Sequence, residues 1–104
     1  MSVKHITAAE FKTLTAAPGR TVLVKFYADW CGPCKQFAPI LAKFAAEHPE
    51  ITVCEMNIDD SENISTVAAL EITTIPTIML FRDGHLVYRT SGFLSHKDLA
   101  ALNL

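Results

Sequence analysis

The sequence predicts an α/β fold in one domain, with a mixed central sheet and helices on both faces of that sheet. Strand-like and helix-like stretches alternate along the chain, an order that favours parallel strands joined by crossover helices. The Asp83-Gly84 dipeptide between two apolar runs is a strong hairpin signal, which adds antiparallel strands near the end of the chain. The chain has 104 residues, of which 50% are hydrophobic and 19% charged, so it can bury one packed core.

The first part of the chain is expected to form a strand, a helix and a second strand. The short first strand covers residues 3–6. Thr7 and Glu10 form a capping box, a hydroxyl three residues before a carboxylate, so a helix should begin there and end at Pro18-Gly19. Residues 21–28 are nearly all apolar or β-branched, as in a strand that is buried on both faces.

A longer amphipathic helix is expected from about residue 34 to 48, followed by a strand over residues 51–58. Pro39 lies inside this helix and should kink it, because proline removes one backbone donor. The apolar residues that fall on one face of the helix are Phe37, Ile40, Leu41, Phe44 and Ala45.

The last part of the chain is expected to form a helix, a hairpin and a closing helix. The helix covers residues 62–70, and the hairpin strands cover 77–81 and 86–89. Ser95 caps the closing helix, which should run to about residue 102. The residues of the 62–70 helix that are expected to face inward are Ile64, Val67 and Ala68.

Charge and hydropathy argue against several classes of function. The net charge of −2 gives no support for nucleic-acid binding. No apolar run reaches the length of about 18 residues that a membrane span needs, and the N-terminus lacks the apolar core of a secretory signal. Met1 followed by Ser2 is typical of a natural start, so we expect a cytoplasmic location. There, a close cysteine pair is more often catalytic or metal-binding than structural.

The run Cys31-Gly32-Pro33-Cys34 suits dithiol-disulfide exchange. At the first turn of a helix, free backbone N–H groups and the helix dipole stabilise the Cys31 thiolate, the form that attacks a disulfide. Cys31, at the exposed end of the helix, would be the nucleophile. Cys34 lies about one turn further on, deeper in the helix, and would resolve the mixed disulfide. Pro33 suits a helix start because it has no donor to leave unpaired, and Gly32 lets a partner backbone come close.

A zinc site is the main alternative for this cysteine pair. Zinc normally takes four ligands, and no second C-x-x-C or H-x-H pair is present. Cys54 and His48 could contribute, but one lies within an expected strand and the other at a helix end. We therefore expect no metal and no cofactor, and interpret Cys54 as an inert core thiol, with a regulatory thiol as the alternative. The residues expected to be ordinary surface histidines are His5, His48, His85 and His96.

Residues 29–35, DWCGPCK, resemble the active-site signature of the thioredoxin family. Ile75-Pro76-Thr77 resembles the family's cis-proline loop, residues 81–84 resemble its strand end and turn, and Gly92 matches a glycine beside its substrate groove. The resemblance covers essentially the whole chain. It implies one thioredoxin domain over residues 1–104, with a central mixed five-stranded sheet flanked by four helices.

The resemblance also implies the activity, a thiol-disulfide oxidoreductase that reduces protein disulfides through a reversible Cys31–Cys34 disulfide. It implies disulfide-containing protein substrates, recharging by a thioredoxin reductase, a monomer, and a role in electron transport and cell redox homeostasis. Pro76 is expected to be cis, with its loop facing Cys31 and pairing with the substrate backbone. Trp30 in the core is the alternative to Trp30 at the groove. The residues expected at the groove are Trp30, Gly32, Pro33, Thr74, Ile75, Pro76 and Gly92, with Phe93 at its rim.

Three positions depart from the family pattern. Lys25 stands where thioredoxins usually have a buried aspartate, Glu55 where they usually have a lysine, and Tyr27 where tryptophan is common. Because the two charges are exchanged, we expect Lys25 and Glu55 to form a buried ion pair. The alternative is that the Lys25 stem crosses the core and its ammonium reaches water.

The exchanged charges affect the chemistry expected of Cys34. A carboxylate raises the pKa of nearby thiols, whereas Lys25 should lower it, with Glu55 cancelling part of the effect. A more stable thiolate makes the couple more oxidising, so Lys25 and Glu55 are candidate modulators of Cys34. The group that handles the Cys34 proton is then Glu55, neutral Lys25 or water.

Two alternatives to a general disulfide reductase follow from the sequence. The first is a more oxidising, oxidase- or isomerase-like variant, which Lys25 would favour and the missing signal segment argues against. The second is a non-catalytic binding module with the same fold.

Overall fold

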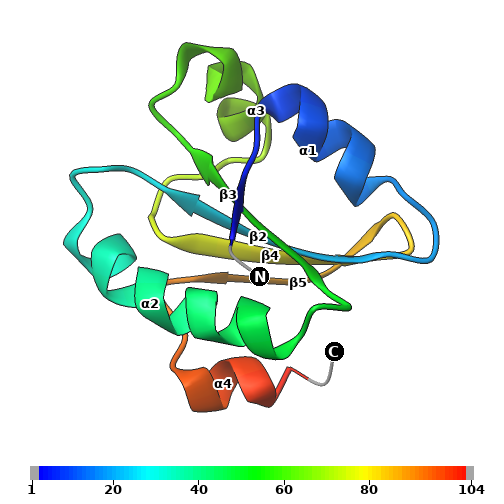
Figure 1. The fold of residues 1–104 in the computed structure, drawn as a ribbon. Helices are drawn as coiled ribbons and strands as arrows, with labels where there is room; N and C mark the ends of the chain where they lie inside the picture. Colours follow the sequence, from blue (N-terminus) through cyan, green and yellow to red (C-terminus); the bar gives the residue numbers. More distant parts are fainter. Residues whose placement is uncertain (1–2, 103–104) are drawn as a thin grey trace.

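A five-stranded mixed sheet lies at the centre of the computed structural model, which describes residues 3–102 (Figure 1). The strands are β1 (Lys4–His5), β2 (Thr21–Tyr27), β3 (Thr52–Asn57), β4 (Thr77–Arg82) and β5 (His85–Ser91). Their order across the sheet is β1-β3-β2-β4-β5. β1, β3 and β2 run parallel to one another, β4 runs antiparallel to β2, and β5 runs antiparallel to β4. This mixed sheet confirms the expected fold class.

Helices cover both faces of the sheet. The helices are α1 (Ala8–Thr15), α2 (Gly32–Glu47), α3 (Ile64–Ala69) and α4 (His96–Ala100), with a 3-10 turn over Ser61–Asn63 before α3. In Figure 1, α1 and α3 lie on one side of the sheet and α2 and α4 on the other. Within the described part of the chain, no helix combines the length and apolar character that a bilayer span needs.

The core is divided by the sheet into two layers, and β2 contributes to both. Val24 and Phe26 pack with α1 and the end of α3, whereas Leu23 packs with α2 and α4. Side chains of a strand alternate between its faces, so Lys25 lies on the Leu23 side, under α2. A cation is therefore placed in the layer that carries the active-site helix.

The expected helix over 62–70 is partly wrong. It divides into the 3-10 turn and α3. Ile64 is 55% exposed rather than inward, and Ala68, one turn further on, is exposed as well. The buried residue is Asn63, and Val67 lies one turn further along the same face. Asn63 takes the inward position because its amide bonds the Ala8 N–H and the Asn57 carbonyl, both at 2.9 Å.

Several local predictions are confirmed. Thr7 and Ser95 both form capping boxes, although α4 ends at Ala100, short of residue 102. The hairpin turn has positive φ at both Asp83 and Gly84, 53° and 83°, as a two-residue type I′ turn requires. α2 continues through Pro39, so the kink there stays a prediction.

Candidate active site

The cysteine pair lies at the start of α2, which begins two residues earlier than expected. Cys31 is the residue that caps the helix, and its Sγ accepts a hydrogen bond from the Cys34 N–H at 3.2 Å. Pro33 occupies the first turn, where its missing donor costs nothing. The two cysteines form a disulfide with their Cα atoms 5.3 Å apart. A Cys31 thiolate would thus meet a backbone donor and the positive end of the helix dipole.

The two cysteines differ in surroundings rather than in exposure. Cys31 was expected at the exposed end, yet it is 4% exposed and Cys34 2%. The Sγ atom of Cys31 lies 3.7 Å from the Ile75 carbonyl oxygen. Cys34 instead lines a cavity on the Lys25 side. One sulfur therefore faces the loop before β4, and the other faces the charged layer beneath the helix.

The loop before β4 contains the expected cis bond between Ile75 and Pro76. The Gly92 N–H donates to the Pro76 carbonyl at 2.8 Å, so the glycine expected beside the groove does lie against this loop. The Thr77 hydroxyl donates to the Thr74 carbonyl, which closes the loop on itself. Because the Ile75 carbonyl lies against Cys31 Sγ, these bonds place Thr74, Pro76 and Gly92 at the loop that faces the disulfide.

Trp30 lies at the surface, which excludes the alternative of a core tryptophan. Its side chain is 68% exposed, and the indole N–H donates to an Asp59 carboxylate oxygen at 2.7 Å. Phe93, also exposed, meets the Phe37 ring edge-on with centroids 6.4 Å apart. Sequence reasoning missed Asp59, because nothing in the sequence links residues 29 positions apart.

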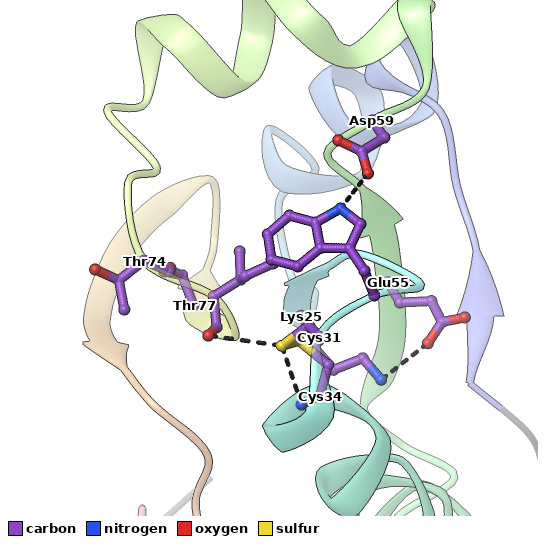
Figure 2. Close-up of a disulfide and its surroundings, with 9 residues drawn as sticks. Lys25, Cys31, Cys34, Glu55, Asp59, Thr74 and Thr77 are labelled. Atoms are coloured by element: carbon purple, nitrogen blue, oxygen red, sulfur yellow. Dashed lines mark hydrogen bonds and ion pairs between the residues drawn. A yellow bond between two sulfur atoms is a disulfide. The ribbon is translucent and has the colours of Figure 1, made fainter.

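Lys25 and Glu55 form the expected ion pair, with Nζ and Oε1 3.2 Å apart (Figure 2). The two residues are directly opposite in the parallel β2–β3 ladder. Lys25 is 3% exposed, which excludes the alternative of an ammonium in water. Its ammonium also lies 5.1 Å from the centroid of the Tyr27 ring, a cation–π contact that helps to offset its burial.

A cavity of about 360 Å³ joins the ion pair to Cys34. The lining residues are Lys25, Tyr27, Ala28, Asp29, Cys34, Lys35, Ala38 and Glu55. Burial and the nearby Glu55 charge raise the pKa of Tyr27 to about 12, so its phenol stays neutral. Lys25, Glu55 and Cys34 thus line one shared cavity.

His5 extends this charged group toward solvent, a connection that sequence reasoning missed. It is half-exposed, as expected of a surface histidine, but its Nδ1 lies 3.1 Å from the Tyr27 hydroxyl and 3.7 Å from Glu55 Oε2. Its Nε2 lies 3.8 Å from an Asp60 oxygen. These contacts come from three separate segments, so only the folded sheet brings them together.

Cys54 is a buried thiol away from the active site. It packs in the layer under α1, as expected of a core residue, and burial raises the pKa of its thiol to about 12. That the thiol is inert stays a prediction. Within residues 3–102, no group of three or more histidine, cysteine, aspartate or glutamate side chains could hold a metal ion.

Comparisons with known proteins agree with the site. A family model described as thioredoxin matches residues 2–103. The chain is similar to the thioredoxin of Chlamydia pneumoniae, with 41% identity over 100 residues, covering 96% of this chain and 94% of that protein. It is 39% identical to the thioredoxin of Pseudomonas aeruginosa, with coverage of 95% and 91%. Among solved structures it resembles a chloroplastic thioredoxin z, with a TM-score of 0.86 and 28% identity, covering 98% of this chain and 91% of that one.

Proposed function

The chain belongs to the thioredoxin family and is a thiol-disulfide oxidoreductase, and from this we propose that it serves as a general protein-disulfide reductase with Cys31 attacking and Cys34 resolving. The observation that carries the proposal is the position of Cys31. Its sulfur caps α2 and faces the Ile75 carbonyl in the cis-proline loop, where a substrate disulfide would be held.

The first step is attack by the Cys31 thiolate on one sulfur of a substrate disulfide. The substrate S–S bond breaks, a mixed disulfide with Cys31 forms, and the departing thiolate takes up a proton. The Cys34 N–H and the helix dipole stabilise the negative charge on Cys31 before the attack.

The second step is attack by Cys34 on the Cys31 sulfur. Cys34 gives up its proton toward the cavity that Lys25 and Glu55 line, the Cys31–Cys34 bond forms, and the second substrate thiol leaves. Two electrons and two protons have then passed from the dithiol to the substrate. A thioredoxin reductase returns two electrons to the disulfide and starts the next cycle.

The substrate groove lies between the start of α2 and the cis-proline loop. An extended substrate backbone pairs with the loop by strand addition, which gives affinity with little selectivity for side chains. The exposed rings of Trp30 and Phe93 supply the apolar rim. The other groove residues are Gly32, Pro33, Thr74, Ile75, Pro76 and Gly92.

The proposal includes the setting in which the protein works. The whole chain, residues 1–104, forms one thioredoxin domain that acts as a monomer in the cytoplasm. It carries electrons to disulfide-containing proteins and so contributes to cell redox homeostasis, with no bound cofactor, nucleic acid or membrane.

Insulin reduction tests the proposed function. The pre-reduced protein should break the insulin disulfides. Cys31→Ser should abolish this activity, and Cys34→Ser should accumulate a mixed disulfide that mass spectrometry detects. A Cys31→Ser protein as active as the wild type would contradict the role of Cys31. An inactive wild-type protein that still binds partners would support the binding module instead.

The Lys25–Glu55 pair favours one second candidate, a more oxidising variant of the same enzyme. A buried cation near Cys34 stabilises the thiolate and hence the reduced form. The midpoint potential of the Cys31–Cys34 couple separates the two candidates, because an oxidase-like protein would have a clearly less negative value than a general reductase.

A further inference from the structure

The cis-proline loop starts at the C-terminal end of α3, and Arg89 on β5 is bonded to that end. Its Nη1 donates to the Leu70 carbonyl at 2.7 Å, and its Nη2 donates to the Glu71 carbonyl at 3.0 Å. Carbonyls at a helix end lack partners within the helix and carry the negative end of its dipole. A planar guanidinium can satisfy two neighbouring acceptors at once, which the point-like ammonium of lysine cannot do in the same way.

The turn that Arg89 contacts has an unfavourable backbone conformation. Glu71 has a φ of 55°, in the left-handed region where glycine is the usual residue. The Ile72 N–H reaches back to the Val67 carbonyl at 3.1 Å, which closes the turn. A turn that a non-glycine residue adopts needs support from its surroundings, and the two bonds from Arg89 come from another element of the fold.

Arg89 connects this turn to the rigid sheet. It lies opposite Met79 in the β4–β5 ladder, and Met79 is fully buried in the core layer beneath α1. From Glu71 the chain reaches Pro76 in five residues, and the Gly92 N–H holds the far end of the loop at the Pro76 carbonyl. One end of the loop is thus bonded to Gly92 and the other end to Arg89.

We propose that Arg89 is a positioning residue for polypeptide substrates. By holding the Leu70 and Glu71 carbonyls, it sets the position of the loop that carries Ile75 and Pro76 relative to Cys31. This inference rests on the proposed pairing of that loop with an extended substrate backbone. A small disulfide that does not pair with the loop needs Cys31 but does not need Arg89.

The test compares Arg89→Met with Arg20→Met. Methionine keeps much of the side-chain stem and removes the donors, and Arg20 is an exposed arginine before β2, so the control makes the same change in charge. Pre-reduced proteins react with insulin or with hydroxyethyl disulfide in single-turnover experiments, followed by alkylation of the thiols. Arg89→Met should raise the half-saturating insulin concentration by about fivefold, with the maximal rate nearly unchanged.

Four further readouts separate positioning from a general loss of structure. The rate with hydroxyethyl disulfide and the midpoint potential should stay at wild-type values, and Arg89→Lys should recover part of the insulin affinity. Glu71→Gly relieves the left-handed turn, so Arg89→Met with Glu71→Gly should regain stability but not insulin affinity. Unchanged insulin saturation, equal losses on both substrates, or full recovery with Glu71→Gly would each overturn the proposal. Failure of the proposed function would instead show as a wild-type protein that reduces the small disulfide but not insulin.

Discussion

At the scale of single residues, the buried ion pair under α2 is the feature most specific to this chain. Lys25 is almost fully buried and its partner Glu55 only partly, so the pair lies at the inner wall of a cavity. A lone charge in a central strand would be costly, and pairing across the β2–β3 ladder relieves that cost. Because the cation is the deeper member, we expect it to dominate the field at Cys34.

Exchanging the two charges tests this expectation. Lys25→Asp with Glu55→Lys keeps an ion pair and the net charge, but places the carboxylate at the deeper position. The carboxylate should raise the pKa of Cys34, and a rise of about one unit corresponds to about 30 mV. The midpoint potential should therefore become more negative by about 30 mV. A redox titration against glutathione measures the potential, and thiol alkylation against pH measures the Cys34 titration. Equal values for both proteins would contradict the role of Lys25.

At the scale of elements, Asn63 is the junction of three segments. Its side-chain amide donates to the end of β3 and accepts from the first N–H of α1, while its own backbone leads into α3. It is completely buried, so both bonds replace contacts with water. The junction also supports the strand end that precedes Asp59, the partner of Trp30.

Asn63→Ala should destabilise the fold by about 2–4 kcal/mol, because the buried Ala8 N–H and Asn57 carbonyl would both lose a partner. Urea unfolding followed by circular dichroism measures the loss. Ser65→Ala, on the exposed side of α3, is the matched control and should change the unfolding free energy by less than about 0.5 kcal/mol. Similar losses for the two variants would argue against the junction.

The contact between α2 and α4 should make stability depend on pH. A hydrogen bond with His96, 2.7 Å away, lowers the pKa of Glu47 from its ordinary value. A carboxyl whose pKa is depressed by folding adds stability above its unfolded pKa and loses it as the pH falls through the folded pKa. Glu47→Gln should therefore lose less stability than the wild type between about pH 5 and pH 3, measured by urea unfolding at low salt. If the unfolding free energies of the two proteins fall equally over this pH range, the role of Glu47 would be contradicted.

At the scale of the whole molecule, the edge of the sheet bears on the oligomeric state. β5 is the outer strand, and its pairing with β4 shifts between Leu80 and Phe81, where Val87 is the extra residue of a bulge. A bulge disturbs the straight edge that another strand would need for pairing. The half-exposed apolar residues of this strand, Leu86 and Val87, lie at the bulge.

The protein should therefore be a monomer in solution. Light scattering after size exclusion should give a mass near 11.4 kDa across a wide range of protein concentrations. A mass that doubles with concentration would indicate pairing through an edge or a face. Loss of that dimer in Val87→Lys would then assign the contact to β5.

Much of the fold and of the reaction could be predicted because their signals are local. Capping boxes at Thr7 and Ser95, the Asp83-Gly84 turn and the periodicity of α2 each depend on residues a few positions apart. The prediction failed at α3, where helical periodicity placed Ile64 inward. A polar residue with partners on two distant segments took that position instead, and periodicity carries no information about such partners.

The sequence by itself determined the fold class, the dithiol chemistry of Cys31 and Cys34, and the pairing of Lys25 with Glu55, which two matched departures from a family pattern indicated. Only the tertiary structure decided the surroundings of these groups. It brought His5 to Glu55, Asp59 to Trp30 and Arg89 to the end of α3. The physical reason is that such contacts join exposed or polar side chains far apart in the chain, whose meeting depends on strand order and register rather than on any local preference.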